Sequence, residues 1–112
     1  MGQSSARGDE GAYFGIDVDH DGSGVVLRAS GELDAASAQE LGEAFHGAAR
    51  PGQPLALDLA GVTFIDSSGL RAIASEARRY HDSGTSFRIS ATSESVHRIL
   101  QMTGLDSLIS AG

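Results

Sequence analysis

The spacing of apolar residues in this sequence alternates between a period of two residues, typical of strands, and a period of three to four, typical of helices. This alternation limits the possible folds. Apolar residues alternate with polar ones at 14–18 and at 25–29, on either side of the turn-forming segment 21–24, which predicts a β-hairpin. Amphipathic helices are predicted after the hairpin, and two further strands separate them. One is the short, largely apolar segment 55–59, and in the other Phe87 and Ile89 alternate with Arg88 and Ser90. The order β-β-α-β-α-β-α predicts an α/β domain with a mixed sheet of four or five strands and three to four helices, mainly on one face.

The first predicted helix has an apolar stripe at helical spacing, formed by Ala38, Leu41, Phe45 and Ala48. Two residues compete to cap its start. One is Asp34, and the other is Ser37, because Glu40 three residues later would complete a capping box with that serine. The dipeptide at 51–52, proline followed by glycine, ends the helix.

Two more helices are predicted, one from about Ser67 to His81 and one that ends at Gly104, a residue suited to a left-handed C-cap. The earlier of the two is expected to bury Leu70, Ile73, Ala74 and Ala77. Its polar face is expected to contain Arg71, Ser75, Glu76, Arg78 and Arg79. The later helix has one face formed by Val96, Ile99, Leu100 and Thr103. The dipeptide at 108–109 would add a short last strand.

Length and composition limit the chemistry available to this chain. Its 112 residues predict one domain at 12–112, preceded by a polar and mobile tail at 1–11. We expect this domain to be a monomer when free. The absence of cysteine and lysine excludes disulfides, thiol nucleophiles, Schiff bases and a P-loop lysine. A net charge of −7 argues against nucleic acids and anionic membranes as partners. No segment resembles a transmembrane span or a signal peptide, so we expect a cytoplasmic protein.

The histidines and the acidic residues do not indicate a metal site or a catalytic centre. No metal-ligand spacing relates the four histidines, which are His20, His46, His81 and His97. The closest functional-looking acidic pair is Glu32 and Asp34, where a strand ends and a helix begins, and helix capping alone would explain it. We therefore expect no bound metal and no cofactor.

The most distinctive segment is Asp66-Ser67-Ser68-Gly69-Leu70, which has two hydroxyl groups where a strand leads into a helix. The first N–H groups of a helix have no intrahelical partners, so a helix cap is one sufficient interpretation. A nucleophile elbow requires glycine two residues before the serine, and Ile65 or Asp66 stands there instead. A phosphoacceptor is the remaining interpretation, because a phosphate at this place would meet the positive end of the helix dipole and unpaired N–H donors.

The block Leu57–Leu70 resembles the signature of the STAS domain, above all that of the bacterial anti-sigma factor antagonists. Two further segments agree with this family in order and spacing, Gly31-Glu32-Leu33-Asp34 and Met102-Thr103-Gly104-Leu105. The resemblance spans the chain from Tyr13 to Ile109. It implies a STAS-type fold and a partner-switching protein rather than an enzyme.

In such proteins the unphosphorylated domain binds an anti-sigma factor, which in many systems is also a serine kinase, and thereby frees a sigma factor. The resemblance implies that the kinase uses ATP to phosphorylate Ser67, rather than Ser68, and that a metal-dependent serine phosphatase removes the phosphate. The alternative is a STAS accessory subunit of an ABC-type lipid transporter, in which the same surface docks on an ATPase.

The resemblance also implies a partner-binding face around the phosphorylated serine. The matching positions are Glu32, Leu33, Asp34, Asp66, Ser67, Ser68, Gly69, Leu70 and Arg71. Arg71 departs from the family pattern, because several relatives have a second glycine there. A bulky cation at this position is expected to alter the choice of partner or to form a salt bridge with the phosphate.

Overall fold

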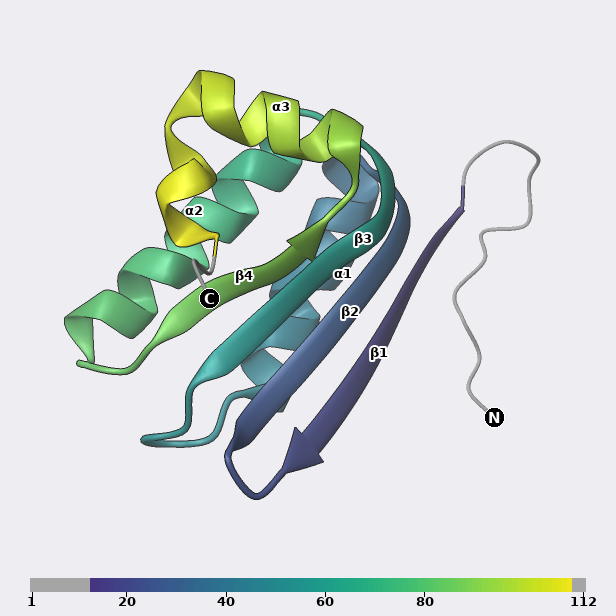
Figure 1. Cartoon of the computed structure of the whole chain (residues 1–112). Helices are drawn as coiled ribbons and strands as arrows, with labels where there is room; N and C mark the ends of the chain where they lie inside the picture. Colours follow the sequence, from purple (N-terminus) through teal and green to yellow (C-terminus); the bar gives the residue numbers. More distant parts are fainter. Residues whose placement is uncertain (1–12, 110–112) are drawn as a thin grey trace.

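The computed structural model describes residues 13–109, so the expected tail at 1–11 and both limits of the expected domain at 12–112 lie outside the described residues. The elements follow the predicted order along the chain (Figure 1). They are β1 Phe14–Asp21, β2 Gly24–Leu33, α1 Ala35–Ala48, β3 Leu55–Ile65, α2 Ser67–Asp82, β4 Phe87–Thr92, α3 Glu94–Thr103 and the 3-10 helix η1 Leu105–Leu108.

The described strands form one mixed sheet in the order β1-β2-β3-β4. β1 pairs antiparallel with β2 and places Asp21 opposite Gly24, which confirms the predicted hairpin. The Asp21 Oδ1 accepts hydrogen bonds from the backbone N–H groups of Ser23, at 2.8 Å, and of Gly24, at 3.0 Å. The hydroxyl and N–H of Ser23 lower the pKa of Asp21. β2 and β3 pair in parallel, as do β3 and β4, so these three strands end at the same edge of the sheet.

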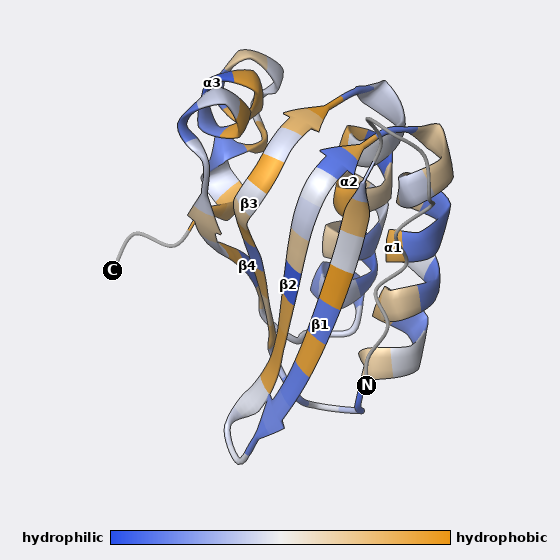
Figure 2. Ribbon diagram, turned by 90° about the vertical axis from the view of Figure 1, so that its right-hand side faces the viewer, coloured by the Kyte–Doolittle hydropathy of each residue, from blue (hydrophilic) through white to orange (hydrophobic). Residues whose placement is uncertain are grey.

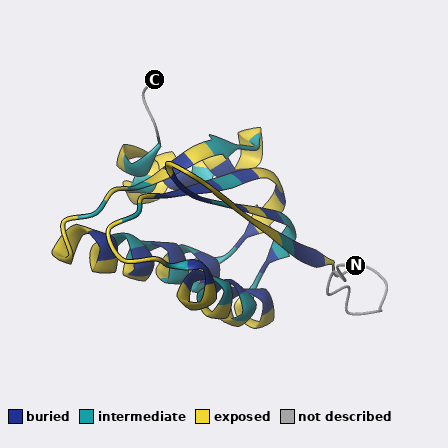
Figure 3. Cartoon of the chain, turned by 90° about the horizontal axis from the view of Figure 1, so that it is seen from below, coloured by how far each residue is buried: buried dark blue, intermediate teal, exposed yellow. Residues whose placement is uncertain are grey.

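Helices α1 and α2 lie side by side against one face of the sheet, whereas α3 stands apart at the ends of β3 and β4 (Figures 1 and 2). The buried residues of α1 and α2 are on the sides that face the sheet (Figure 3). All four residues of the predicted α1 stripe are buried, namely Ala38, Leu41, Phe45 and Ala48. The prediction of an α/β domain with helices mainly on one face is therefore confirmed.

The buried stripe of α2 differs from the predicted one. It consists of Gly69, Ile73, Glu76 and Tyr80, whereas the predicted Leu70, Ala74 and Ala77 are only half-buried. The prediction that Glu76 belongs to the polar face was wrong, because its exposed fraction is 5%. α2 contacts α1 as well as the sheet, so more of its surface is covered than a single apolar stripe would predict. The Glu76 Oε2 lies 2.6 Å from the Arg79 Nη2, so the buried charge is paired.

The C-terminal part of the described chain confirms one prediction and corrects another. Gly104 ends α3 with φ of 81°, which is the predicted left-handed C-cap. The expected last strand at 108–109 does not form: Leu108 is the last residue of η1, and Ile109 forms only a single parallel bridge with Ile89. The described sheet therefore has four strands.

Candidate functional site

The ends of β2 and β3 bring the starts of two helices together. Leu33 and Ile65 are register partners at the carboxyl ends of these parallel strands, and α1 and α2 begin two residues after them. The Asp66 N–H donates to the Leu33 carbonyl oxygen at 3.1 Å, which fixes one helix start against the other. Asp34 and Asp66 are the N-cap residues of the two helices. The acidic segments identified in the sequence therefore form one site at one end of the molecule.

Asp66 caps α2 with both its side chain and its backbone. Its Oδ1 accepts hydrogen bonds from the N–H groups of Ser68, at 2.9 Å, and Gly69, at 3.2 Å. The Leu70 N–H donates to the Asp66 carbonyl oxygen at 3.0 Å. The expectation that a phosphate here would meet unpaired N–H donors is therefore wrong for these three groups, because the cap already satisfies them.

The two serines after Asp66 differ in exposure. Ser67, the first residue of α2, is exposed, and its hydroxyl has no hydrogen bond to any residue in the described part of the chain. Ser68 is half-buried. The Ser67 hydroxyl is therefore accessible from solvent while the helix is intact.

Gly69 lets α2 start close to the sheet. A Cβ atom added to this residue would lie 2.7 Å from the Leu33 Cγ and 2.9 Å from the Ile65 Cγ1. Both distances are shorter than van der Waals contact, so a larger residue would push α2 away from the strand ends. Gly69 and Leu33 are themselves buried, and they position the exposed residues of this site from beneath.

The start of α1 resolves the choice between two caps that the sequence left open. Asp34 is the N-cap, and Ser37 lies inside the helix at its third position. The Ser37 Oγ accepts from the Asp34 N–H at 2.8 Å and donates to the Glu32 carbonyl oxygen at 2.7 Å. Ser37 is fully buried. Its hydroxyl therefore has only a structural role, and the alternative capping box with Glu40 does not form.

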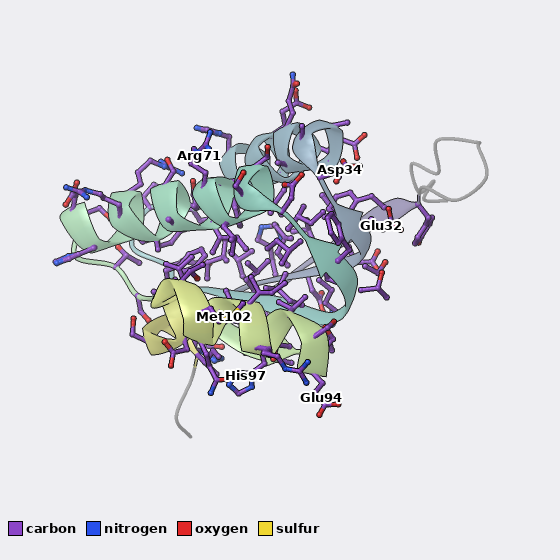
Figure 4. All side chains as sticks on the ribbon, turned by 90° about the horizontal axis from the view of Figure 1, so that it is seen from above. Glu32, Asp34, Arg71, Glu94, His97 and Met102 are labelled. Carbon is purple, nitrogen blue, oxygen red and sulfur yellow. The ribbon has the colours of Figure 1, made fainter. Side chains whose placement is uncertain are left out.

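The remaining site residues surround Ser67 with mixed charge. Glu32, Asp34, Asp66 and Leu70 are half-buried, whereas Arg71 is exposed on the first turns of α2. Figure 4 shows Asp34 and Arg71 at this end of the molecule, on neighbouring helices. No salt bridge joins Arg71 to a residue between 13 and 109. The site therefore combines several carboxylates with one guanidinium that has no salt bridge to a described residue.

One exposed apolar residue at this site is not predicted from the sequence. Phe64 pairs with Glu32 at the end of β3, and its exposed fraction is 47%. The available signal was the pair Phe64-Ile65, because successive strand residues point to opposite faces and only one of the two can enter the same core. Ile65 is the buried one. Phe64 therefore adds an apolar contact surface beside the acidic residues.

Two negative findings apply to the part of the chain that the structure describes. No three histidine, aspartate or glutamate side chains gather there in a way that could hold a metal ion. No helix among the described elements is both long and apolar enough to cross a membrane.

Comparison with known proteins identifies the family. The model of the STAS domain matches residues 15–111. The anti-sigma-B factor antagonist of Bacillus subtilis is 29% identical over 94 residues, which cover 84% of this chain and 86% of that protein. The anti-sigma F factor antagonist of Paenibacillus polymyxa is 30% identical and covers 80% of this chain and 79% of its own length. These relatives are named as antagonists of regulatory factors and not as enzymes.

Solved structures agree with this assignment. An anti-sigma factor antagonist from Mycobacterium paratuberculosis superposes with a TM-score of 0.75 at 27% identity and covers 86% of this chain and 82% of its own. The phosphorylated form of the Bacillus protein SpoIIAA has the same fold, with a TM-score of 0.66 at 19% identity and coverage of 85% and 88%. The sequence match, the mixed sheet and the paired helix starts lead to one conclusion: this chain belongs to the STAS domain family.

Proposed function

We propose that this protein is an anti-sigma factor antagonist whose binding is controlled by phosphorylation of Ser67. The unphosphorylated chain binds an anti-sigma factor that is also a serine kinase, and this frees a sigma factor to direct transcription. The kinase transfers phosphate from ATP to Ser67 and is released, and a metal-dependent phosphatase restores the hydroxyl. The chain itself acts in the cytoplasm as a binding protein, with no cofactor and no catalytic step of its own.

The observation that carries this proposal is the exposure of the Ser67 hydroxyl at the first position of α2. The neighbouring cap does not depend on it, because Asp66 satisfies the Ser68 and Gly69 N–H groups without Ser67. Phosphorylation therefore changes the surface and leaves the helix start intact. The names of the relatives support the class of partner.

The proposed docking face consists of the exposed and half-buried residues around this hydroxyl, which are Glu32, Asp34, Phe64, Asp66, Ser67, Ser68, Leu70 and Arg71. Phe64 provides apolar area, and the carboxylates favour a partner with a basic surface. Leu33 and Gly69 lie beneath this face and fix its shape. A partner that fits these groups closely leaves no room for a phosphate in the interface.

Electrostatics gives the direction and the scale of the effect. A phosphoserine adds about −1.5 to −2 charges at neutral pH. Two unit charges of like sign 6 Å apart repel by roughly 2.8 kcal/mol at an effective dielectric constant of 20. A loss of that size weakens binding about 100-fold. In the free protein the phosphate faces water and is screened, so the penalty falls on the complex.

The proposal is tested by incubating the chain with its cognate anti-sigma kinase and ATP and following the protein mass. We expect one phosphate per chain on the wild-type protein and on Ser68→Ala, and none on Ser67→Ala. Phosphorylation of Ser67→Ala at the wild-type rate would contradict the site assignment. Recovery of a transporter ATPase in place of a sigma-pathway protein would contradict the class of partner and favour the transporter subunit.

A further inference from the structure

We propose that Arg71 binds the phosphate on Ser67 as an intramolecular clasp, one helical turn along α2. This inference rests on the proposed function, because it concerns the phosphorylated state of the same serine. It assigns to Arg71 a role in the modified protein itself, separate from contact with a partner.

The start of α2 has few free hydrogen-bond donors for a phosphate. Asp66 already accepts the N–H groups of Ser68 and Gly69 through its Oδ1, and that of Leu70 through its carbonyl oxygen. The Asp66 carboxylate also brings a negative charge next to the modified residue. Any counter-charge that this chain offers to a phosphate on Ser67 therefore has to come from a side chain.

Arg71 is placed to supply that counter-charge. It lies four positions after Ser67 on α2, and residues with this spacing are neighbours on one helix face, with Cβ atoms about 5–6 Å apart. Side chains in helices lean toward the N-terminus, a direction that brings a side chain at position 71 within reach of position 67. Its forked donors match two phosphate oxygens.

Arg71 also differs from Arg28, Arg50 and Arg79, which have partners within the described chain. Arg28 lies 3.9 Å from Asp58, and Arg79 lies 2.6 Å from Glu76. Arg50 donates to the carbonyl oxygens that end α1. Arg71 is exposed and has no salt bridge to a residue at 13–109, so the clasp breaks no existing interaction.

The clasp has a consequence that can be measured on the isolated protein. A guanidinium beside the phosphate favours the dianion and lowers the second pKa of phosphoserine, which is ordinarily about 6. The modified site then keeps its full negative charge at mildly acidic pH. The clasp also holds the phosphate along α2, over the proposed docking face.

The test uses the full chain with phosphoserine incorporated at position 67 during translation, so no kinase is required. Phosphorus NMR is recorded from pH 4.5 to 8 on this protein and on its Arg71→Gln variant. We expect Arg71→Gln to raise the second pKa of the phosphate by roughly 0.5 of a pH unit, a shift of the size that an exposed ion pair supports. At 1 M salt the difference should nearly vanish.

Arg78→Gln is the matched control. It removes the same charge from an exposed position of α2 that lies about 16 Å from Ser67 along the helix axis, and it should leave the pKa of the phosphate unchanged. Arg71→Lys should keep only part of the shift, because an ammonium lacks the forked donors. A phosphate pKa that is equal in the wild type and Arg71→Gln would overturn the clasp.

These outcomes are separate from those of the proposed function. The phosphate is installed by translation, so a normal clasp together with a kinase that ignores Ser67 would refute the proposed function alone. A phosphate pKa that is the same in the wild type and in Arg71→Gln, on a serine that the kinase does modify, would refute the clasp alone.

Discussion

The starts of α1 and α2 form a natural pair for comparison. Each helix is capped by an aspartate with φ of −110°, at the end of one of two neighbouring parallel strands. At α1 the nearby serine, Ser37, is buried and bonded to the backbone of Glu32 and Asp34. At α2 the serine that follows the cap is exposed, without a partner among the described residues. The same capping chemistry thus has a purely structural use at α1 and leaves a hydroxyl available at α2.

The largest effect is expected where α2 meets the strand ends. Gly69→Val introduces atoms into the space of the Leu33 and Ile65 side chains, and overpacking of this kind costs about 2–3 kcal/mol of unfolding free energy. Urea denaturation measures the loss. Gly47→Ala in α1 is the control, since nothing lies within 4 Å of its added Cβ, and it should gain up to about 1 kcal/mol. A fully stable Gly69→Val protein would mean that α2 is not held by this contact.

The second prediction compares the two serines directly. Ser37→Ala leaves the Asp34 N–H and the Glu32 carbonyl oxygen without their buried partner, so we expect a loss of about 2 kcal/mol. Ser67→Ala removes an exposed hydroxyl and should change stability by less than about 0.5 kcal/mol. Thermal and urea unfolding of the two variants provide the measurement. Equal losses would remove the distinction between a structural and an available hydroxyl.

A smaller effect is expected at the cap of α2. Asp66→Ala removes the acceptor of the Ser68 and Gly69 N–H groups and should cost about 1 kcal/mol of unfolding free energy. Asp66→Asn keeps an oxygen acceptor and should cost much less. Denaturant unfolding of both variants tests this order, and an equal cost for the two would point to the charge of Asp66 rather than to its capping hydrogen bonds.

The smallest effect concerns a second hydroxyl without a partner, at the other end of α2. The Tyr80 Oη is buried and unbonded within the described structure, so Tyr80→Phe should leave the protein equally stable or more stable by about 1 kcal/mol. Burial raises the pKa of Tyr80 above its ordinary value of about 10. The wild type should therefore lose stability above pH 10, as the unfolded chain ionises first, and Tyr80→Phe should lose less. Urea titrations at pH 7 and 10.5 decide this.

Much of the fold follows from the sequence because periodicity and strand order are local signals. The α1 stripe from Ala38 to Ala48 has one regular spacing and packs on one surface, so its burial is predictable. The buried stripe of α2 is not predictable in this way, because that helix contacts both the sheet and α1. The sequence does not reveal the second contact, and Glu76 is buried although it is charged. Its pairing with Arg79, three residues later, was the one available hint.

The candidate site, too, is only partly predictable from the sequence. The sequence places Asp34 and Asp66 before two helices, and parallel pairing of β2 with β3 brings them together. It does not determine which serine faces outward, since that depends on how closely Gly69 packs against Leu33. Nor does it show that Asp66 occupies the N–H groups that a phosphate would otherwise use. The first depends on tertiary packing, and the second depends on the local geometry of the helix cap.

The central claim is that a phosphate on Ser67 prevents docking of another protein. Its most direct test is isothermal titration of the cognate anti-sigma factor with the unmodified chain and with the chain that has phosphoserine at position 67. We predict affinity at least 100-fold lower for the phosphorylated chain, with both chains equally folded. Equal dissociation constants for the two chains would contradict the account.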